Sequence, residues 1–164
     1  MRNFRNNRLL IMISTIYISG IISSFIIVSP ATISLDNKGI TIWGIMQTFS
    51  LNYWYIILIW LFGLSMIGYL FTLFIIYFRG FTFGILILFL GKINFSYLLL
   101  LSLVEIVIFI PMFFVLTYQA IMISYNKQNY NHLTMDNYNK LLVVITIGIF
   151  LYSIIIEIIG GIYG

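Results

Sequence analysis

The chain has 164 residues, of which 62% are hydrophobic and only 7% are charged, and its formal net charge is +4. Soluble domains carry about 25% charged residues, and several apolar stretches here exceed the roughly 20 residues that cross a bilayer. The composition therefore excludes an ordinary soluble domain and predicts a single membrane domain over 1–164. The absence of cysteine excludes disulfides and thiolate metal sites, and the small positive charge does not indicate nucleic-acid binding.

The first predicted span runs from about Leu9 to Val28 and follows a basic head with Arg2, Arg5 and Arg8. Its apolar run of about 20 residues exceeds the usual ~7–15 of a signal-peptide core, so we interpret it as a retained span. Because basic residues favour the cytoplasmic side, the N-terminus is predicted to be cytoplasmic. The connection 29–52 is then an extracytoplasmic loop, and its aromatic second half is either a short interfacial helix or a plain loop.

The middle of the chain is predicted to cross the membrane once and then form a hairpin. The apolar run Tyr53–Phe78 is long enough to cross alone with tilt. Arg79 follows, and then an apolar stretch too short to cross, which ends at a turn over Gly91–Asn94. The next stretch, Phe95–Tyr125, is long enough to cross and protrude.

The second polar connection, 126–140, is predicted to be a cytoplasmic loop, and the last span runs from about 141 to 159. We therefore predict an all-α fold, a polytopic integral membrane helical bundle of about five membrane segments, with a short or broken helix hairpin around 79–105. A six-span arrangement is the alternative. Lys38 and Lys92 would be external with five spans, which opposes the five-span arrangement mildly.

The hairpin predicts an intramembrane charge pair. In an antiparallel hairpin, residues equidistant from the turn lie at the same depth, and at 1.5 Å per residue Arg79 and Glu105 lie about 20 and 19 Å from it. A charge within the membrane is costly and marks a function or a pair. Three interpretations stay open: Arg79 reaches alone to the inner face, the pair fixes the hairpin, or the pair serves transport or a proton relay.

Glycines are predicted to mark close helix contacts. Gly80 and Gly84 have a small-x-x-x-small spacing, and Gly91 falls on the same helical stripe. Such stripes let helix backbones approach closely in lipid. Gly63 and Gly68 are predicted to form a second patch of this kind within the preceding span.

Glu157 is the other acid in apolar surroundings and lies near the outer end of the last span. As a candidate outer-face acid, it either pairs with Lys38 or Lys92 or lies at the headgroup level.

The sequence carries no constellation for catalysis. His132, the only histidine, lies in a polar connection, which favours a solvated side chain over a base or a ligand. Asp36 and Asp136 are predicted on opposite sides of the membrane and cannot form a dyad. Zinc, nucleophile-elbow and P-loop motifs are absent. We therefore expect no enzyme, with no catalytic residues, cofactor or metal.

One pattern resembles a known family. Trp60, Gly63, Ser65 and Gly68 form a W-x-x-G-x-S-x-x-G run, followed by Arg79, Gly80 and Gly84. This pattern resembles that of the stage II sporulation protein M family, and the similarity covers roughly Asn52 to Ser124. Many members also carry a His-Gly-x-x-Glu element; Glu105 matches its glutamate, whereas Leu101 and Ser102 replace the histidine and glycine.

The resemblance implies a small, non-enzymatic, multi-pass protein of the bacterial cell membrane that works with other membrane proteins, including an ABC-type ATPase or permease. Short relatives occur in gene clusters for circular bacteriocins, which favours a role in export, maturation or self-immunity. One alternative is a sporulation-type scaffold for peptidoglycan-remodelling enzymes, and another is an independent small channel or carrier. Homo-oligomerisation stays open.

Overall fold

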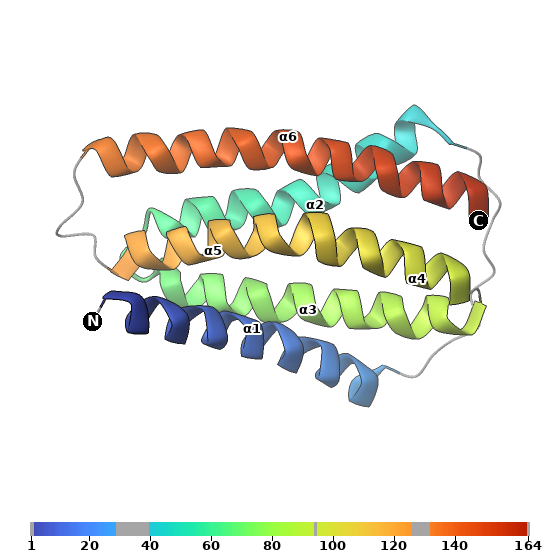
Figure 1. Cartoon of the computed structure of the whole chain (residues 1–164), viewed down its shortest axis with the longest axis horizontal. Coiled ribbons are helices and arrows are strands. Elements are labelled where there is room, and N and C mark those ends of the chain that lie inside the picture. The colour runs from blue at the N-terminus through green and yellow to red at the C-terminus, as the bar shows by residue number, and fades with distance from the viewer. Residues whose placement is uncertain (1, 29–39, 94, 126–131, 164) are drawn as a thin grey trace.

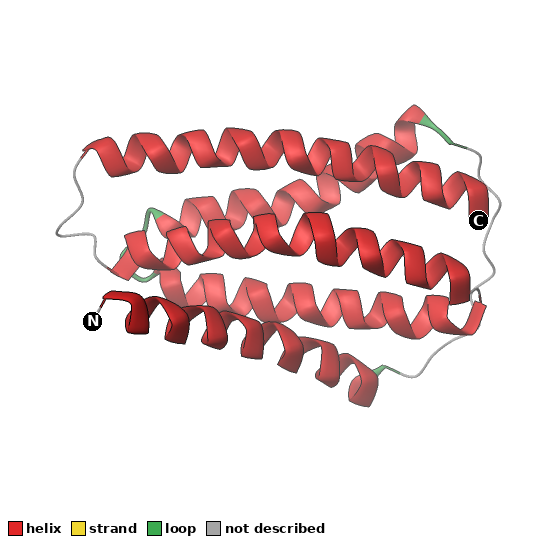
Figure 2. Cartoon of the chain, in the orientation of Figure 1, coloured by secondary structure: helices red, strands yellow, loops and turns green. Residues whose placement is uncertain are grey.

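The computed structural model describes residues 2–28, 40–93, 95–125 and 132–163. These residues are almost entirely helical and hold no strand (Figure 2). In chain order the elements are α1 (Arg2–Ile27), α2 (Ile42–Gly63), α3 (Gly68–Ile93), α4 (Phe95–Val104), the π-helical segment η1 (Glu105–Phe109), α5 (Ile110–Tyr125) and α6 (His132–Tyr163).

The helices form five long rods, because α4, η1 and α5 are continuous, and successive rods run antiparallel (Figure 1). In the described part of the chain, five segments are long and apolar enough to cross a membrane: Asn7–Ile27, Ile42–Gly63, Gly68–Gly91, Phe95–Tyr125 and Met135–Ile162. Large apolar side chains such as Ile26, Trp43 and Phe74 are exposed on the outside of the bundle, where lipid can cover them. The chain is therefore an all-α, multi-pass membrane protein, as predicted.

The predicted boundaries of the second and third spans are wrong. Instead of one span over Tyr53–Phe78, α2 ends at Gly63, the chain turns through 64–67, and α3 returns from Gly68. The predicted break at Arg79 is also wrong, because α3 continues through this residue to Ile93. The first arm of the predicted hairpin is thus a full-length helix.

The turn between α2 and α3 escaped prediction because a distant helix supplies its polar partner. Ser124, near the end of α5, is 1% exposed. Its hydroxyl donates to the carbonyl of Ser65 at 2.6 Å and accepts from the backbone N–H of Tyr69 at 2.9 Å. Backbone groups at the membrane must be satisfied within the protein, and here one serine satisfies both sides of an otherwise apolar turn.

Gly63 and Gly68 flank this turn and do not form the predicted patch on one helix. A Cβ atom at Gly68 would overlap the carbonyl group of Phe62, so the turn itself requires glycine. Gly63 does make a close helix contact, since a Cβ there would lie 3.0 Å from Ala120 and would overlap the hydroxyl of Tyr138.

Both predicted polar connections are shorter in the structure. α2 begins at Ile42, so the second half of the predicted loop 29–52 is helical and continues directly into the following apolar span. The side chain of Thr41 caps this helix by accepting from the N–H of Gly44 at 3.0 Å. α6 begins at His132, so 132–140 is helical. The remaining parts, 29–39 and 126–131, lie outside the described residues.

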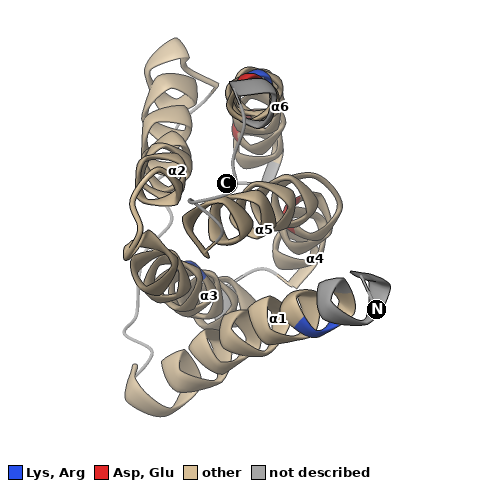
Figure 3. Cartoon of the chain, turned by 90° about the vertical axis from the view of Figure 1, so that its left-hand side faces the viewer, with Lys and Arg blue, Asp and Glu red and all other residues tan. Residues whose placement is uncertain are grey.

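α1 lies at the edge of the bundle and packs mainly on α3 (Figure 3). A Cβ at Gly80 would overlap the backbone of Tyr17, and one at Gly84 would lie 2.9 Å from the carbonyl oxygen of Ile21. On α1, Gly20 is equally close to the backbone of α3. The predicted glycine stripe therefore forms this contact through Gly80 and Gly84.

Gly91 does not belong to the stripe, because a Cβ there would make only an ordinary contact with Leu98, at 3.5 Å. All five rods contribute to a core of buried apolar side chains. Those least exposed include Ile13, Ile56, Ile59, Ile76, Phe109, Phe113, Leu116 and Ile149.

Candidate functional site

Two charged side chains lie at mid-depth of the membrane-crossing helices. At 1.5 Å per residue, Arg79 is about 17 Å from either end of the span Gly68–Gly91. Glu105 opens η1, about 15 Å into its own span, which begins at Phe95. The predicted location of Arg79 near the inner face is therefore wrong, because α3 starts earlier than expected.

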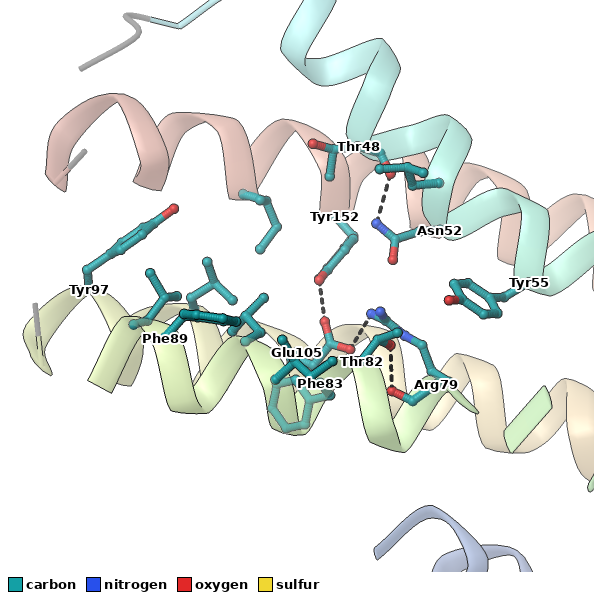
Figure 4. A pocket seen from close by; sticks show the side chains of 16 residues that line it. Thr48, Asn52, Tyr55, Arg79, Thr82, Phe83, Phe89, Tyr97, Glu105 and Tyr152 are labelled. Atoms are coloured by element: carbon teal, nitrogen blue, oxygen red, sulfur yellow. Dashed lines mark hydrogen bonds and ion pairs between the residues drawn. The ribbon is translucent and has the colours of Figure 1, made fainter. Parts of the chain in front are cut away.

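The structure brings Arg79 and Glu105 together, as the hairpin geometry predicts. Arg79 Nη2 lies 2.5 Å from Glu105 Oε1, and the two side chains are only 11% and 2% exposed. The other carboxylate oxygen accepts a hydrogen bond from the hydroxyl of Tyr152 on α6 (Figure 4). The guanidinium carbon of Arg79 lies 4.2 Å from the ring centre of Phe109 and 5.6 Å from that of Tyr55, within range of cation–π attraction.

This network excludes the interpretation in which Arg79 reaches alone to the inner face. Burying a charge is tolerated when it is paired and hydrogen-bonded. Here the carboxylate of Glu105 is bonded through both oxygens, and the guanidinium of Arg79 is held by the carboxylate and two rings. The pair joins α3 to the α4–η1–α5 rod and, through Tyr152, to α6.

The π-helical segment positions Glu105. The N–H of Ile110 bonds to the carbonyl of Glu105, five residues earlier. Pro111 follows at once and has no N–H, so the regular bond to the carbonyl of Val107 cannot form and the helix widens before it. Both Glu105 and Phe109 are 1% exposed and face the interior. Single π-helical turns often occur at functional sites.

The pair borders a cavity of about 600 Å³ between α2, α3, α4 and α6 (Figure 4). Its apolar lining includes Leu51, Phe83, Ile85, Leu86, Phe89, Leu90, Leu101 and Ile156. Among the polar lining residues, Thr82 donates to the carbonyl of Arg79 at 2.9 Å, and the amide of Asn52 donates to the carbonyl of Thr48 at 2.8 Å. The cavity is thus apolar over most of its wall and polar beside the ion pair.

Sequence reasoning missed the partners that come from other helices: Tyr152, Phe109 and Tyr55. Buried tyrosines usually find a hydrogen-bond partner, and Tyr152 lies within the apolar run of the last span. That signal marks Tyr152 as a residue in need of a partner. It does not identify the partner, because the packing of α6 against η1 cannot be read from spacing along the chain.

Glu157 is bound at the start of α2. Its Oε1 atom accepts from the backbone N–H of Thr41 at 3.2 Å and from the Thr41 hydroxyl at 3.3 Å. Gly44 provides the room, since a Cβ there would overlap the carboxylate. A helix N-terminus favours a negative charge. The lysines predicted as partners, Lys38 and Lys92, lie outside the described side chains.

Among the described residues, no three His, Cys, Asp or Glu side chains gather as metal ligands. His132 begins α6, but its side chain is not among the described ones. Asp36 lies outside the described residues.

These observations define a multi-pass helical membrane protein with a buried, hydrogen-bonded ion pair beside a largely apolar cavity. Comparisons with protein-family models, with curated proteins and with solved structures found no match. The resemblance of Trp60–Gly84 to the stage II sporulation protein M family therefore stays a prediction.

Proposed function

We propose that this chain is a non-enzymatic subunit of a larger complex in the bacterial cell membrane, which serves export, maturation or self-immunity for a circular bacteriocin together with an ABC-type transporter. The resemblance of Trp60–Gly84 supports this class of function. In the fold these residues form the end of α2, the turn and the first part of α3. The pattern thus corresponds to one structural unit, which ends at the glycines that pack against α1.

The observation that carries the proposal is that the Glu105 carboxylate is buried and hydrogen-bonded through both of its oxygens. Both oxygens of Glu105 are hydrogen-bonded, and its side chain is only 2% exposed. A carrier or proton relay needs groups that exchange partners during each cycle, whereas a pair held by three helical rods favours one fixed arrangement. The geometry therefore supports a rigid membrane subunit over an independent carrier.

The same structure gives less support to a sporulation-type scaffold. Such a scaffold would bind its enzymes through the external connection between α1 and α2. Because α2 begins at Ile42, the polar connection before it is shorter than predicted. Less chain is available for an external partner.

The proposal is tested in the native host by tagging the chain and purifying it in mild detergent. We expect an ABC-type ATPase or permease to co-purify, and we expect deletion of the gene to lower either bacteriocin secretion or survival when bacteriocin is added. Complementation by Glu157→Gln should succeed, whereas Glu105→Ala should fail. Purification of the chain alone, with an unchanged deletion strain, would contradict the proposal. Solute flux through liposomes that contain only this chain would favour a carrier instead.

The orientation is tested separately by cysteine labelling, because the natural chain has no cysteine. With a cytoplasmic N-terminus, Asp36→Cys should react with a membrane-impermeant maleimide in intact cells. Lys127→Cys should react only after the membrane is permeabilised. The reverse pattern would show that the N-terminus lies outside.

A further inference from the structure

The cavity beside the ion pair has the size and lining of a ligand site. Its volume of about 600 Å³ falls within the roughly 300–1,000 Å³ typical of small-molecule pockets, which combine apolar walls with a few polar groups. Five helical elements contribute to it, and Figure 4 shows Phe83 and Phe89 of α3 along one side and Asn52 of α2 on the other.

The polar end of this cavity has unused hydrogen-bonding capacity. Among the described residues, the Arg79 guanidinium donates a hydrogen bond only through Nη2, and its side chain is 11% exposed where it borders the cavity. Asn52 uses its amide nitrogen on Thr48, which leaves its carbonyl oxygen as an acceptor. In Figure 4 the Asn52 amide and the Arg79 guanidinium face each other across the cavity. A donor and an acceptor are therefore presented together.

The charge and depth of the site restrict what can bind there. Arg79 is already neutralised by Glu105, so a charged ligand would add an uncompensated charge within the membrane, which is costly. The headgroups of bilayer lipids lie about 15 Å from the midplane and cannot reach the pair. Their hydrocarbon tails reach it but form no hydrogen bonds.

We propose that the cavity binds an uncharged lipophilic molecule of small-molecule size that carries a hydroxyl or amide group. This group accepts a hydrogen bond from Arg79 and donates one to Asn52, while the apolar body packs against Phe83, Leu86 and Phe89. The site does not depend on the function proposed above, since it follows from the cavity and its unpaired groups alone.

The test uses the full chain in lipid nanodiscs and a long-chain alcohol that carries a photoreactive diazirine. After irradiation, mass spectrometry should find the label on α2 and α3 residues of the cavity, including Leu51 and Leu86. Unlabelled alcohol should compete about tenfold better than the alkane of equal length, because one hydrogen bond to a charged group is worth about a factor of ten or more. The fatty acid, which is ionised, should compete no better than the alkane.

Two matched variants separate specific binding from a lipid-filled crevice. Leu86→Trp fills the cavity and should abolish labelling there, whereas Leu70→Trp, on the exposed surface of the same helix, should leave it unchanged. Asn52→Leu should remove the preference for the alcohol over the alkane. Thermal unfolding of each variant reports whether the fold is retained.

Three results would overturn the proposal. Equal competition by alcohol, alkane and acid would identify a non-specific crevice, and the strongest competition by the acid would identify an anion site. Unchanged labelling of a folded Leu86→Trp variant would place the molecule outside the cavity.

Discussion

The two sides of α3 hold their neighbours by opposite means, and the change occurs between adjacent residues. Gly80 faces α1, where the backbone of Tyr17 occupies the space that any side chain would need. Arg79 faces the other way and uses one of the longest side chains to reach Glu105 and the ring of Phe109. One contact depends on the absence of a side chain, and the other depends on the ion pair between Arg79 and Glu105.

This difference follows from the physics of helix association in lipid. Because lipid tails are as apolar as the helix surfaces, helices associate through close packing and interhelical hydrogen bonds. The α1–α3 contact uses close packing and the α3–η1–α6 contact uses charged hydrogen bonds. The first should fail when volume is added, and the second should fail when one partner is removed.

The largest effect is expected from removing one charge of the pair. Glu105→Ala leaves the charge of Arg79 buried without its counterpart, which should lower the free energy of unfolding by about 3–5 kcal/mol. The double variant Arg79→Met with Glu105→Leu removes both charges and should recover most of this loss. SDS titration of the protein in mixed micelles measures both. A double variant no more stable than Glu105→Ala would contradict the explanation that the single substitution acts by isolating a buried charge.

A smaller effect is expected from removing the third member of the network. Tyr152→Phe removes the hydroxyl that donates to Glu105, and a hydrogen bond to a charged group is worth about 1.5–3 kcal/mol. Tyr17→Phe is the matched control, because the buried hydroxyl of Tyr17 has no partner among the described residues and its loss should be neutral or stabilising. The same titration compares them. If the two variants lost the same free energy of unfolding, the hydrogen bond from Tyr152 to Glu105 would not contribute to stability.

The glycine side of α3 is tested by adding a single methyl group. Gly80→Ala places a Cβ against the backbone of α1 and should cost about 1–3 kcal/mol, as overpacking usually does. Gly91→Ala lies on the same helix and meets only ordinary contact, so it should gain up to about 1 kcal/mol from helix propensity. Unfolding midpoints of the two variants give the comparison directly. If both variants were stabilised, the α1–α3 contact would not depend on the absence of a side chain at Gly80.

The sequence predicted much of this arrangement because hydropathy and simple helix geometry carry the information. The all-α membrane fold followed from apolar runs, and the contact of Arg79 with Glu105 followed from equal distances to one turn. Gly80 and Gly84 followed from their spacing. The partner glycine, Gly20, was missed, although Gly20 and Ser24 on α1 have the same small-x-x-x-small spacing.

What escaped prediction depends on contacts between distant parts of the chain. The turn at 64–67 has few polar residues of its own, and Ser124 satisfies it from another helix. A turn in an apolar run can therefore form without a polar run of its own, because a hydroxyl from another helix can bond to its backbone groups. Tyr152 was missed for the same reason, since its role depends on how α6 packs.

The smallest effect is expected from substituting Glu157. Its comparison with Glu105 tests how depth in the membrane affects the contribution of an acid to stability. Glu157 accepts from Thr41 at the start of α2, near the end of its span, where a charge at a helix N-terminus is worth about 0.3–1 kcal/mol. Glu157→Gln should therefore cost about this much, with a dependence on salt, whereas Glu105→Gln should cost several times more and respond little to salt, because burial limits screening. Unfolding titrations at low and high salt measure both. If both variants lost the same free energy of unfolding, the deeper position of Glu105 would not increase its contribution to stability.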